Sequence, residues 1–390
     1  MFCLFDVVRK INARFTIILF AVFITACDPS ALGNGPSINP GKPVPVALLV
    51  PGGSGNSGDD ILAASLVNAA RMAIADLGGI QIDLRIYDTA GNAENAVGAA
   101  TQAVNEGAKI ILGPVFAQSA AAVGVAVANR NVNVLSFSNN TAIAGGNVFV
   151  LGPTFSNTAN RLARYAVSQG KGNILVVNGN DSSEQIGRDV ISQAVVNSGG
   201  ILAGVSSFEL SQEGVINAIP QITSDARTSG AQAVFLTSGT SGALPFLAQL
   251  LPENGMDPTQ IQYIGLQRWD IPASALTLPG VQHGWFALPD PGLSASFQTR
   301  YNAAYGTNPH PIAGLAYDGI AAIGALVAQG QSDALTRSAL TQAAGFAGVN
   351  GVFRLFADGT NQRGLAIAQI QENQVVVIDP APRSFGGAGL

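Results

Sequence analysis

The chain has few charged side chains and very few cysteines and histidines, and each shortage excludes a class of protein. Only 11% of the residues are charged, whereas soluble proteins average about 25%. The net charge of −5 gives none of the basic field that a nucleic-acid-binding protein needs. Two cysteines cannot form a disulfide scaffold or a four-cysteine zinc site. The two histidines, His283 and His310, leave little for a metal site or a catalytic triad, so we expect neither.

What the sequence does contain is material for a large aliphatic core. Hydrophobic residues make up 47% of the chain and aromatic residues only 7%, so the core must consist mostly of Ala, Val, Ile and Leu. A disordered chain would carry more charge and fewer apolar residues. The length of 390 residues predicts two domains, because one domain typically takes about 100–200 residues.

The N-terminus has the pattern of an export signal. Arg9, Lys10 and Arg14 precede an uninterrupted apolar run over residues 15–26. That run is too short to span the ~30 Å hydrocarbon core of a bilayer, but its length is typical of a signal-peptide core. No later segment is long and apolar enough to span a membrane. We therefore predict a signal peptide over residues 1–26.

The end of the apolar run, the tetrapeptide ITAC at residues 24–27, resembles a bacterial lipobox. The resemblance implies that Cys27 carries the lipid and is the first residue of a mature periplasmic protein, which the membrane holds through its lipid anchor only. Asp28 resembles an enterobacterial signal for inner-membrane retention; where that rule does not apply, the anchor lies in the outer membrane. An ordinary signal peptide with a chance cysteine is the alternative. Residues 27–45 are rich in Pro, Gly, Ser and Asn and predict a flexible tether.

The rest of the chain alternates strand and helix patterns. Repeated βα units predict parallel sheets covered on both faces, and the pattern restarts near residue 148, which predicts two similar α/β lobes. The expected strands are 46–50, 82–87, 109–112, 132–137, 148–151, 174–177, 204–208, 233–237, 262–266, 284–288, 351–356 and 365–377. The expected helices are 59–77, 93–106, 118–129, 158–169, 184–197, 215–228, 244–251, 293–305 and 312–328.

Motifs after three of the first-lobe strands resemble those of a known family. They are Asp88, the tripeptide LGP at 112–114 and the tetrapeptide LSFS at 135–138, with Ala96 and Ala100 in the helix between. Over about residues 44–377 the chain resembles type 1 periplasmic binding proteins, the leucine/isoleucine/valine-binding group. The resemblance implies two doubly wound parallel-sheet lobes, joined by three crossovers, with a ligand cleft between them. We assign residues 46–150 plus about 290–350 to lobe 1, and 151–289 plus about 351–378 to lobe 2.

The resemblance leaves two partners open. The family's solute receptors serve ABC importers, so the first candidate partner is an importer permease. Residues 138–152 are also similar to lipoproteins described as penicillin-binding protein activators, which share the fold and stimulate a peptidoglycan synthase. We lean toward a non-catalytic receptor for a small polar ligand and keep the activator as the alternative.

A glycine-rich loop gives the strongest indication of an enzyme. Residues 53–58, GSGNSG, fit the pattern G-x-G-x-x-G between a strand and a helix, which is typical of dinucleotide binding. Pro51 and Gly52 lengthen a turn that should be tight, however, and Asp88 stands farther from the loop than the acid in that fingerprint. We therefore expect no cofactor, and interpret the loop as the lip of a cleft. A nucleophile elbow and a carboxylate dyad are also missing from the sequence.

The binding hypothesis places ligand contacts at the carboxyl ends of strands, where open α/β sheets receive their ligands. Most of the side chains there are neutral hydrogen-bonding groups. Each one alone is typical of a cap or a turn, so their coincidence at successive strand ends carries the argument. The tryptophan could stack on a ligand or pack between the lobes. The candidates are Ser54, Asn56, Gln118, Ser119, Ser138, Asn139, Asn180, Ser238, Gln267 and Trp269.

Three positions depart from the amino-acid-binding members of the family. Ala117 stands where a serine helps to hold the ligand carboxylate, and Gln267 stands where an acid holds the ammonium. Ile186 stands where a tyrosine often covers the ligand. We therefore expect the fold to be kept, whereas the clamp for a free amino acid is lost.

We predict that Cys27→Ser releases the protein from membranes, because two acyl chains at Cys27 supply stable anchoring and a serine cannot be acylated by this route. Cell fractionation without detergent should find wild type in the membrane pellet and the serine variant in the soluble fraction. A serine variant that stays in the pellet would show that something other than this lipid holds the chain.

Overall fold

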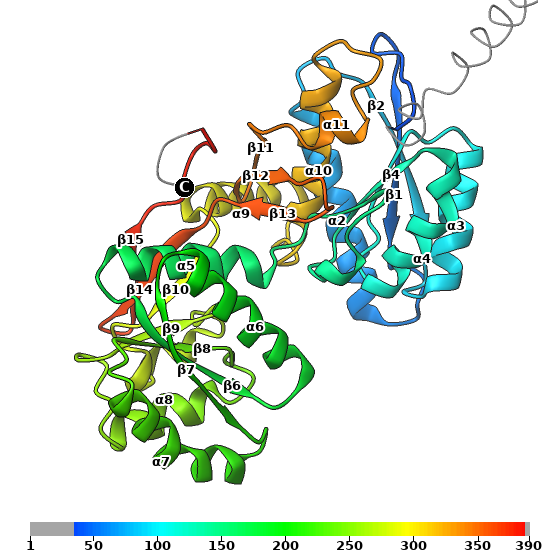
Figure 1. Ribbon diagram of the computed structural model, residues 1–390. Helices are drawn as coiled ribbons and strands as arrows, with labels where there is room; N and C mark the ends of the chain where they lie inside the picture. Colours follow the sequence, from blue (N-terminus) through cyan, green and yellow to red (C-terminus); the bar gives the residue numbers. More distant parts are fainter. Residues whose placement is uncertain (1–34, 387–390) are drawn as a thin grey trace, which may run out of the picture.

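The computed structural model describes residues 35–386, which form two α/β lobes, as predicted (Figure 1). The signal peptide and Cys27 lie outside the described residues. In lobe 1, five parallel strands lie in the order β2-β1-β3-β4-β5. Their bounds are β1 Val44–Val50, β2 Ile82–Asp88, β3 Ile110–Leu112, β4 Asn133–Ser136 and β5 Val148–Val150.

Both faces of the lobe 1 sheet are buried. Along β1, Leu48 packs into the core shared with α2 and α10, whereas the neighbouring Leu49 packs into the core shared with α3 and α4. Successive strand residues point to opposite faces, so an all-apolar strand such as β1 requires helices on both sides. The helices are α2 Ser57–Ala75, α3 Ala93–Asn105, α4 Ala117–Val127, α9 Pro291–Tyr305, α10 Gly314–Val327 and the short α11 Arg337–Leu340.

Lobe 2 contains a seven-stranded sheet in the order β15-β14-β10-β9-β8-β6-β7. Helices α5 and α6 supply one core of this sheet, and α7 and α8 supply the other. The parallel strands are β6 Asn173–Gly179, β7 Ile201–Phe208, β8 Ala233–Leu236, β9 Gln262–Gly265 and β10 Trp285–Leu288. The helices are α5 Phe155–Ser168, α6 Ser182–Asn197, α7 Gln212–Thr228 and α8 Leu244–Glu253. Among the helices of residues 35–386, none is long and apolar enough to cross a membrane.

The C-terminal strands differ from the prediction. The single strand expected at 365–377 is an antiparallel hairpin, β14 Ala366–Gln371 and β15 Gln374–Asp379. Its turn residues Glu372 and Asn373 both have positive φ, at 50° and 63°, which is typical of a tight two-residue hairpin. Three strands form a small antiparallel sheet of their own: β11 Phe346–Gly348, β12 Gly351–Leu355 and β13 Asn361–Arg363.

The boundary expected near residue 351 is therefore wrong. Phe346, Phe353 and Leu355 of the small sheet lie in the core of lobe 1, so this segment extends lobe 1 and the chain enters lobe 2 only after Arg363. The three crossovers connect β5 to α5, β10 to α9 and β13 to β14. We call this junction the hinge.

Part of the expected tether is also fixed to lobe 1. The Gly35 backbone exchanges two hydrogen bonds with the Asn131 side chain, at 2.9 and 2.8 Å. Ile38 is buried in the lobe 1 core, and its N–H donates to the Ser332 carbonyl at 2.8 Å. Residues 35–45 therefore belong to the folded body, held by these three hydrogen bonds, by the buried Ile38 side chain and by the start of β1 at Val44.

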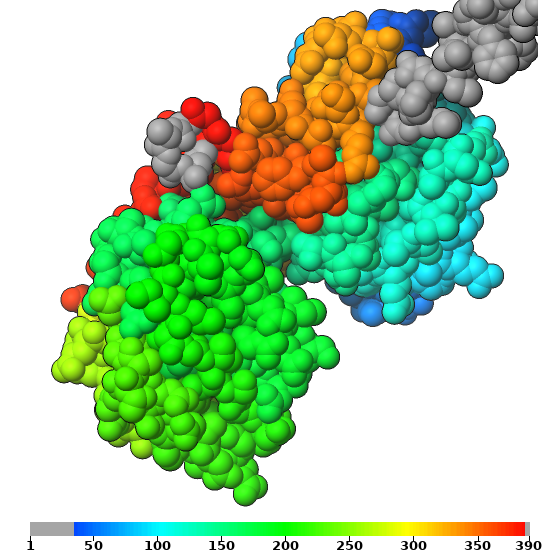
Figure 2. Space-filling view, viewed as in Figure 1, coloured from blue at the N-terminus to red at the C-terminus, as the bar shows by residue number. Residues whose placement is uncertain are grey.

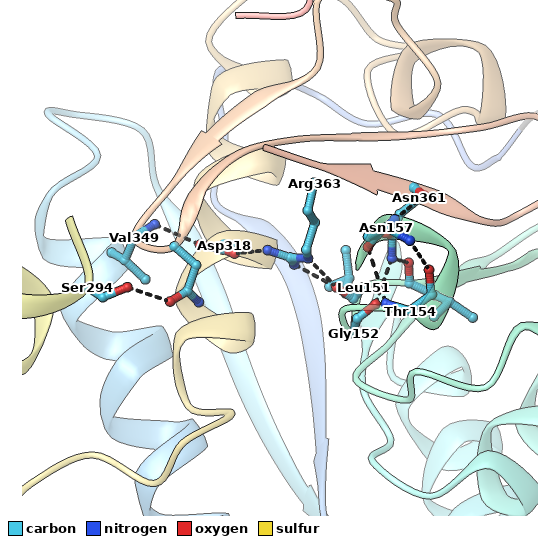
Figure 3. A network of polar contacts seen from close by, with 11 residues as sticks. Leu151, Gly152, Thr154, Asn157, Ser294, Asp318, Val349, Asn361 and Arg363 are labelled. Carbon is cyan, nitrogen blue, oxygen red and sulfur yellow. Dashed lines mark hydrogen bonds and ion pairs between the residues drawn. The ribbon is translucent and has the colours of Figure 1, made fainter. Parts of the chain in front are cut away.

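A buried ion pair lies at the hinge (Figure 3). Arg363 donates to Asp318 Oδ2 at 2.9 Å, and the two side chains are 5% and 0% exposed. The same guanidinium donates twice to the Leu151 carbonyl of the first crossover, at 2.9 and 2.6 Å. Asp318 also accepts from the Val349 N–H at 2.8 Å. Burial raises the pKa of Asp318, and Arg363 opposes that shift.

We predict that Asp318→Asn lowers the free energy of unfolding by about 3–5 kcal/mol, because removing one partner of a buried pair leaves the other charge uncompensated. Urea denaturation measures the change. Asp189→Asn is the matched control: its ion pair with Arg188 is largely exposed and should contribute less than about 1 kcal/mol. Equal losses in the two variants would show that the hinge pair is not a special constraint.

Candidate ligand-binding site

The carboxyl ends of the parallel strands gather at one edge of each lobe. The surface is hollowed between the two lobes (Figure 2). In open α/β sheets this edge is where ligands bind. The loops that follow the strands carry most of the predicted site residues. The two edges differ in what they offer a ligand.

At the lobe 1 edge, the glycine-rich loop is occupied by its own side chains. Asn56 caps α2 by accepting from the Gly58 N–H at 2.9 Å. Ser54 Oγ donates to Asp59 Oδ2 at 2.8 Å, and the Gly53 N–H donates to Asp60 Oδ1 at 3.1 Å. Two carboxylates therefore already use the positive end of α2 and would repel a phosphate there.

The start of α4 is different. Its N-cap residue is Phe116, and among residues 35–386 no side chain caps this helix and no acidic residue lies in its first turn. The first N–H groups of a helix have no partner within it, and together with the helix dipole they form a site for an anion. Gln118 is exposed and Ser119 is buried in this turn, so both predicted residues lie at a start suited to a carboxylate.

Three of the loops at the lobe 1 edge meet beside the start of α4. A Cβ on Gly91 would lie 3.3 Å from Asp59, 3.5 Å from Phe116 and 3.7 Å from Ser54. The loops that follow β1, β2 and β3 are therefore in contact. The ring of Phe116 is 38% exposed, which places an apolar surface beside the uncapped start of α4.

The residues after β4 serve mainly to form a turn. Ser138 is buried, and its Oγ accepts from the Asn140 N–H at 3.1 Å. Asn140 in turn caps the short 3-10 helix Thr141–Ile143. Asn139 is exposed between them and remains the candidate here with a free side chain surface.

At the lobe 2 edge, polar groups from the end of β6 and from the loop after β8 surround one carboxylate, that of Glu184, which was not among the predicted site residues. Glu184 accepts from the Gly179 N–H at 2.5 Å, from Thr237 Oγ1 at 2.8 Å and from Ser238 Oγ at 2.7 Å. Ser238 is fully buried in this cluster. Asp181 caps α6 three residues before Glu184, and that spacing of two acids at a helix start was the signal available in the sequence.

Two other predicted residues border this cluster. Gln267 is exposed and donates from Nε2 to the Thr237 carbonyl at 3.1 Å. Asn180 is exposed and donates from Nδ2 to Glu209 Oε1 at 2.9 Å. The lobe 2 edge therefore brings together Ser238 and Gln267 around one carboxylate, with Asn180 near its rim.

Trp269 does not fit the role of a ligand-stacking residue. Its side chain is fully buried in the lobe 2 core. A Cβ on Gly265 or Gly284 would lie only 2.3 and 2.4 Å from the ring, so both glycines are needed to accommodate it. The ring packs within the core of lobe 2.

Comparison with known proteins agrees with this architecture. Residues 43–374 match a family described as periplasmic binding protein. A solved structure of a putative branched-chain amino acid ABC transporter from Rhodospirillum rubrum has a TM-score of 0.72 and 18% identity, covering 86% of this chain and 100% of that chain. No curated protein sequence matches this chain.

Two further solved structures contain ligands. An ABC transporter substrate-binding protein from Desulfitobacterium hafniense, in complex with Leu, has a TM-score of 0.62 and 15% identity, covering 86% of this chain and 100% of that chain. A solute binding protein from R. palustris, in complex with benzoate, has a TM-score of 0.55 and 16% identity, covering 90% and 100%. Identities this low concern the fold, and the predicted two-lobed α/β fold is confirmed.

We predict that NAD and NADP at millimolar concentration leave the thermal melting temperature unchanged, because Asp59 and Asp60 occupy the place where a pyrophosphate would bind. A ligand at 100 times its Kd would add about 2.7 kcal/mol of stability. The comparison is made at matched ionic strength with potassium chloride. A rise of several degrees with either nucleotide would contradict this interpretation of the loop.

Proposed function

We propose that this chain, which belongs to the periplasmic binding protein family, is the non-catalytic receptor of an ABC importer of the branched-chain amino-acid type. One observation carries the proposal: the edges of the two sheets face the same hollow. The lobe 1 edge has the uncapped start of α4, and the lobe 2 edge has Glu184 with its hydrogen-bond donors. Both are suited to holding a polar ligand. The proposed partners are this ligand and the importer permease, and the proposed location is the periplasm, with a lipid anchor at Cys27.

The hinge supports a mechanism in which the two lobes close on the ligand. The chain crosses between the lobes three times within a small region, and few residues must change conformation for the lobes to rotate. Closure would bring the α4 start and the Glu184 cluster to opposite sides of the ligand. Water would then be excluded, which strengthens each hydrogen bond to the ligand.

The ligand class follows from the groups that the lobe 1 edge offers and from the free acid that the lobe 2 edge lacks. The N–H groups at the start of α4 suit a carboxylate, and leucine and benzoate, the ligands of the two relatives, both carry one. Glu184 is already engaged by three donors, and Gln267 is neutral, so a ligand ammonium would find no free acid in this cluster. The exposed Phe116 and Ile186 suit an apolar body. We therefore propose a small carboxylate with an apolar body and without an ammonium group.

We predict that leucine, isoleucine and valine bind with Kd values above one micromolar, and that benzoate binds at least tenfold more tightly than leucine. The loss of one partner of a buried charge pair typically costs about 2–5 kcal/mol, and ~1.4 kcal/mol corresponds to one decade in Kd. Titration calorimetry on ligand-stripped protein measures these affinities.

Gln267→Glu tests whether the missing acid at this position is the cause of the weak leucine binding. It restores an acid where the family has one, so leucine affinity should rise at least tenfold while benzoate affinity falls. Gln260→Glu, a similar change on an exposed loop before β9, is the control and should alter neither. A submicromolar Kd for leucine in wild type would contradict the ligand class. Absence of binding to any small carboxylate, together with co-purification of a peptidoglycan synthase, would favour the activator role instead.

A further inference from the structure

A second hollow lies at the hinge, and none of the predicted site residues lines it. It is a pocket of about 850 Å³. One wall comes from lobe 2, with Arg161 and Arg164 of α5 and Asp379 of β15. The other comes from the small sheet of lobe 1, with Arg354 and Asn361. Helix α5 contacts both walls, because Asn157 donates to the Asn361 carbonyl of β13 and Arg161 donates to Asp379 of β15. We call this space the hinge pocket.

The hinge pocket is basic although the chain as a whole is acidic. Four arginines and two aspartates line it, whereas the net charge of the chain is −5. Two of the arginines are neutralised: Arg363 by Asp318, and Arg161 by Asp379 at 2.6 Å. Among the described residues no carboxylate pairs with Arg164 or Arg354, which donate to the Asn160 carbonyl at 3.1 Å and to Gln362 Oε1 at 2.9 Å. Arg164 and Arg354 therefore have no paired carboxylate in this part of the chain, and with Asp358 counted the pocket keeps a surplus of one positive charge.

These groups are held in place before any ligand arrives. The Arg354 guanidinium lies 5.2 Å from the ring centre of Phe356 and 4.8 Å from that of Phe385, and such stacking fixes its plane. Burial and the nearby charge of Arg161 lower the pKa of Arg164. Both arginines keep free N–H donors, because each guanidinium has five.

One residue of the pocket wall also carries an unused acceptor. Asn361 is 5% exposed, and its Nδ2 donates to the carbonyls of Val150 and Gly152 at 2.7 and 2.9 Å. Its Oδ1 is buried and has no hydrogen-bond partner within the described residues. A buried polar atom without a partner is costly, and this atom has no surface open to the pocket.

We propose that the hinge pocket binds a small oxyanion, a phosphate or a carboxylate, held between Arg164 of lobe 2 and Arg354 of lobe 1. Bidentate hydrogen bonds from arginine suit both groups. Because the two walls belong to different lobes, the width of the pocket changes with the angle between them. An anion that fits the pocket at the present angle stabilises that angle, in which the lobes stand apart, and therefore opposes closure.

Inorganic phosphate and citrate are the probes, titrated into the full chain by calorimetry at constant ionic strength with chloride. Wild type should bind at least one of them saturably, and the stronger of the two identifies the source of the anion. Arg164→Gln and Arg354→Gln should each weaken that binding at least tenfold. Arg130→Gln is the matched control, because Arg130 is exposed on lobe 1 and does not line the pocket; it should bind like wild type.

Two further measurements keep the outcome interpretable. Circular dichroism melts identify any variant that has lost its fold, and Arg164→Lys, which keeps the charge but loses the planar fork, should bind more weakly than wild type in the native state. Benzoate affinity without phosphate should be unchanged in Arg164→Gln, so a failure of the ligand proposal is distinguishable from a failure here. The proposal that the hinge pocket binds an oxyanion would be overturned if wild type bound neither anion saturably, or if Arg130→Gln lost as much affinity as Arg164→Gln and Arg354→Gln.

Discussion

The Arg363 guanidinium connects two of the crossovers and one lobe core at a single buried point. It lies on the third crossover, donates to the Leu151 carbonyl of the first, and pairs with Asp318 inside lobe 1. A buried charge must keep all of its partners or pay a large desolvation penalty. Breaking any of these contacts would leave the buried guanidinium without one of its partners, so the contacts hold the crossovers together at this point. Asn361 and Asn157 extend the same network into the start of α5 (Figure 3).

The contacts of Arg363 keep the two sheet edges facing the same hollow. Each lobe buries both faces of its own sheet and is stable as a packed unit, so the hollow between the lobes is lined by loops rather than by core. The loops contribute polar groups because their backbone and side chains must remain satisfied while the lobes are apart. The two edges are thus formed within separate cores, as the closure proposed above requires.

The starts of two helices show how similar positions acquire different chemistry. Helix α2 begins after a glycine-rich loop, is capped by Asn56 and has the acids Asp59 and Asp60 in its first turn, whereas α4 begins after Phe116 with no capping side chain and no acid there. Both follow a strand of the same sheet and point their N-termini to the same edge. The side chains of the first turn therefore determine which helix start suits an anion. At α2, which follows the loop that resembles a nucleotide-binding motif, two acidic side chains would repel one.

The sequence by itself determined the order of strands and helices, because hydrophobic periodicity and helix caps are local, and it placed most site candidates at strand ends for the same reason. It did not determine which of those candidates remain available. Trp269 packs in the core because Gly265 and Gly284 leave room for its ring. Glu184 joins the site because three donors converge on it: Gly179 at the end of β6, and Thr237 and Ser238 in the loop after β8. Ile38 and Arg363 likewise acquire their roles from segments distant in the chain. Burial and pairing depend on such long-range contacts, which only the tertiary structure decided.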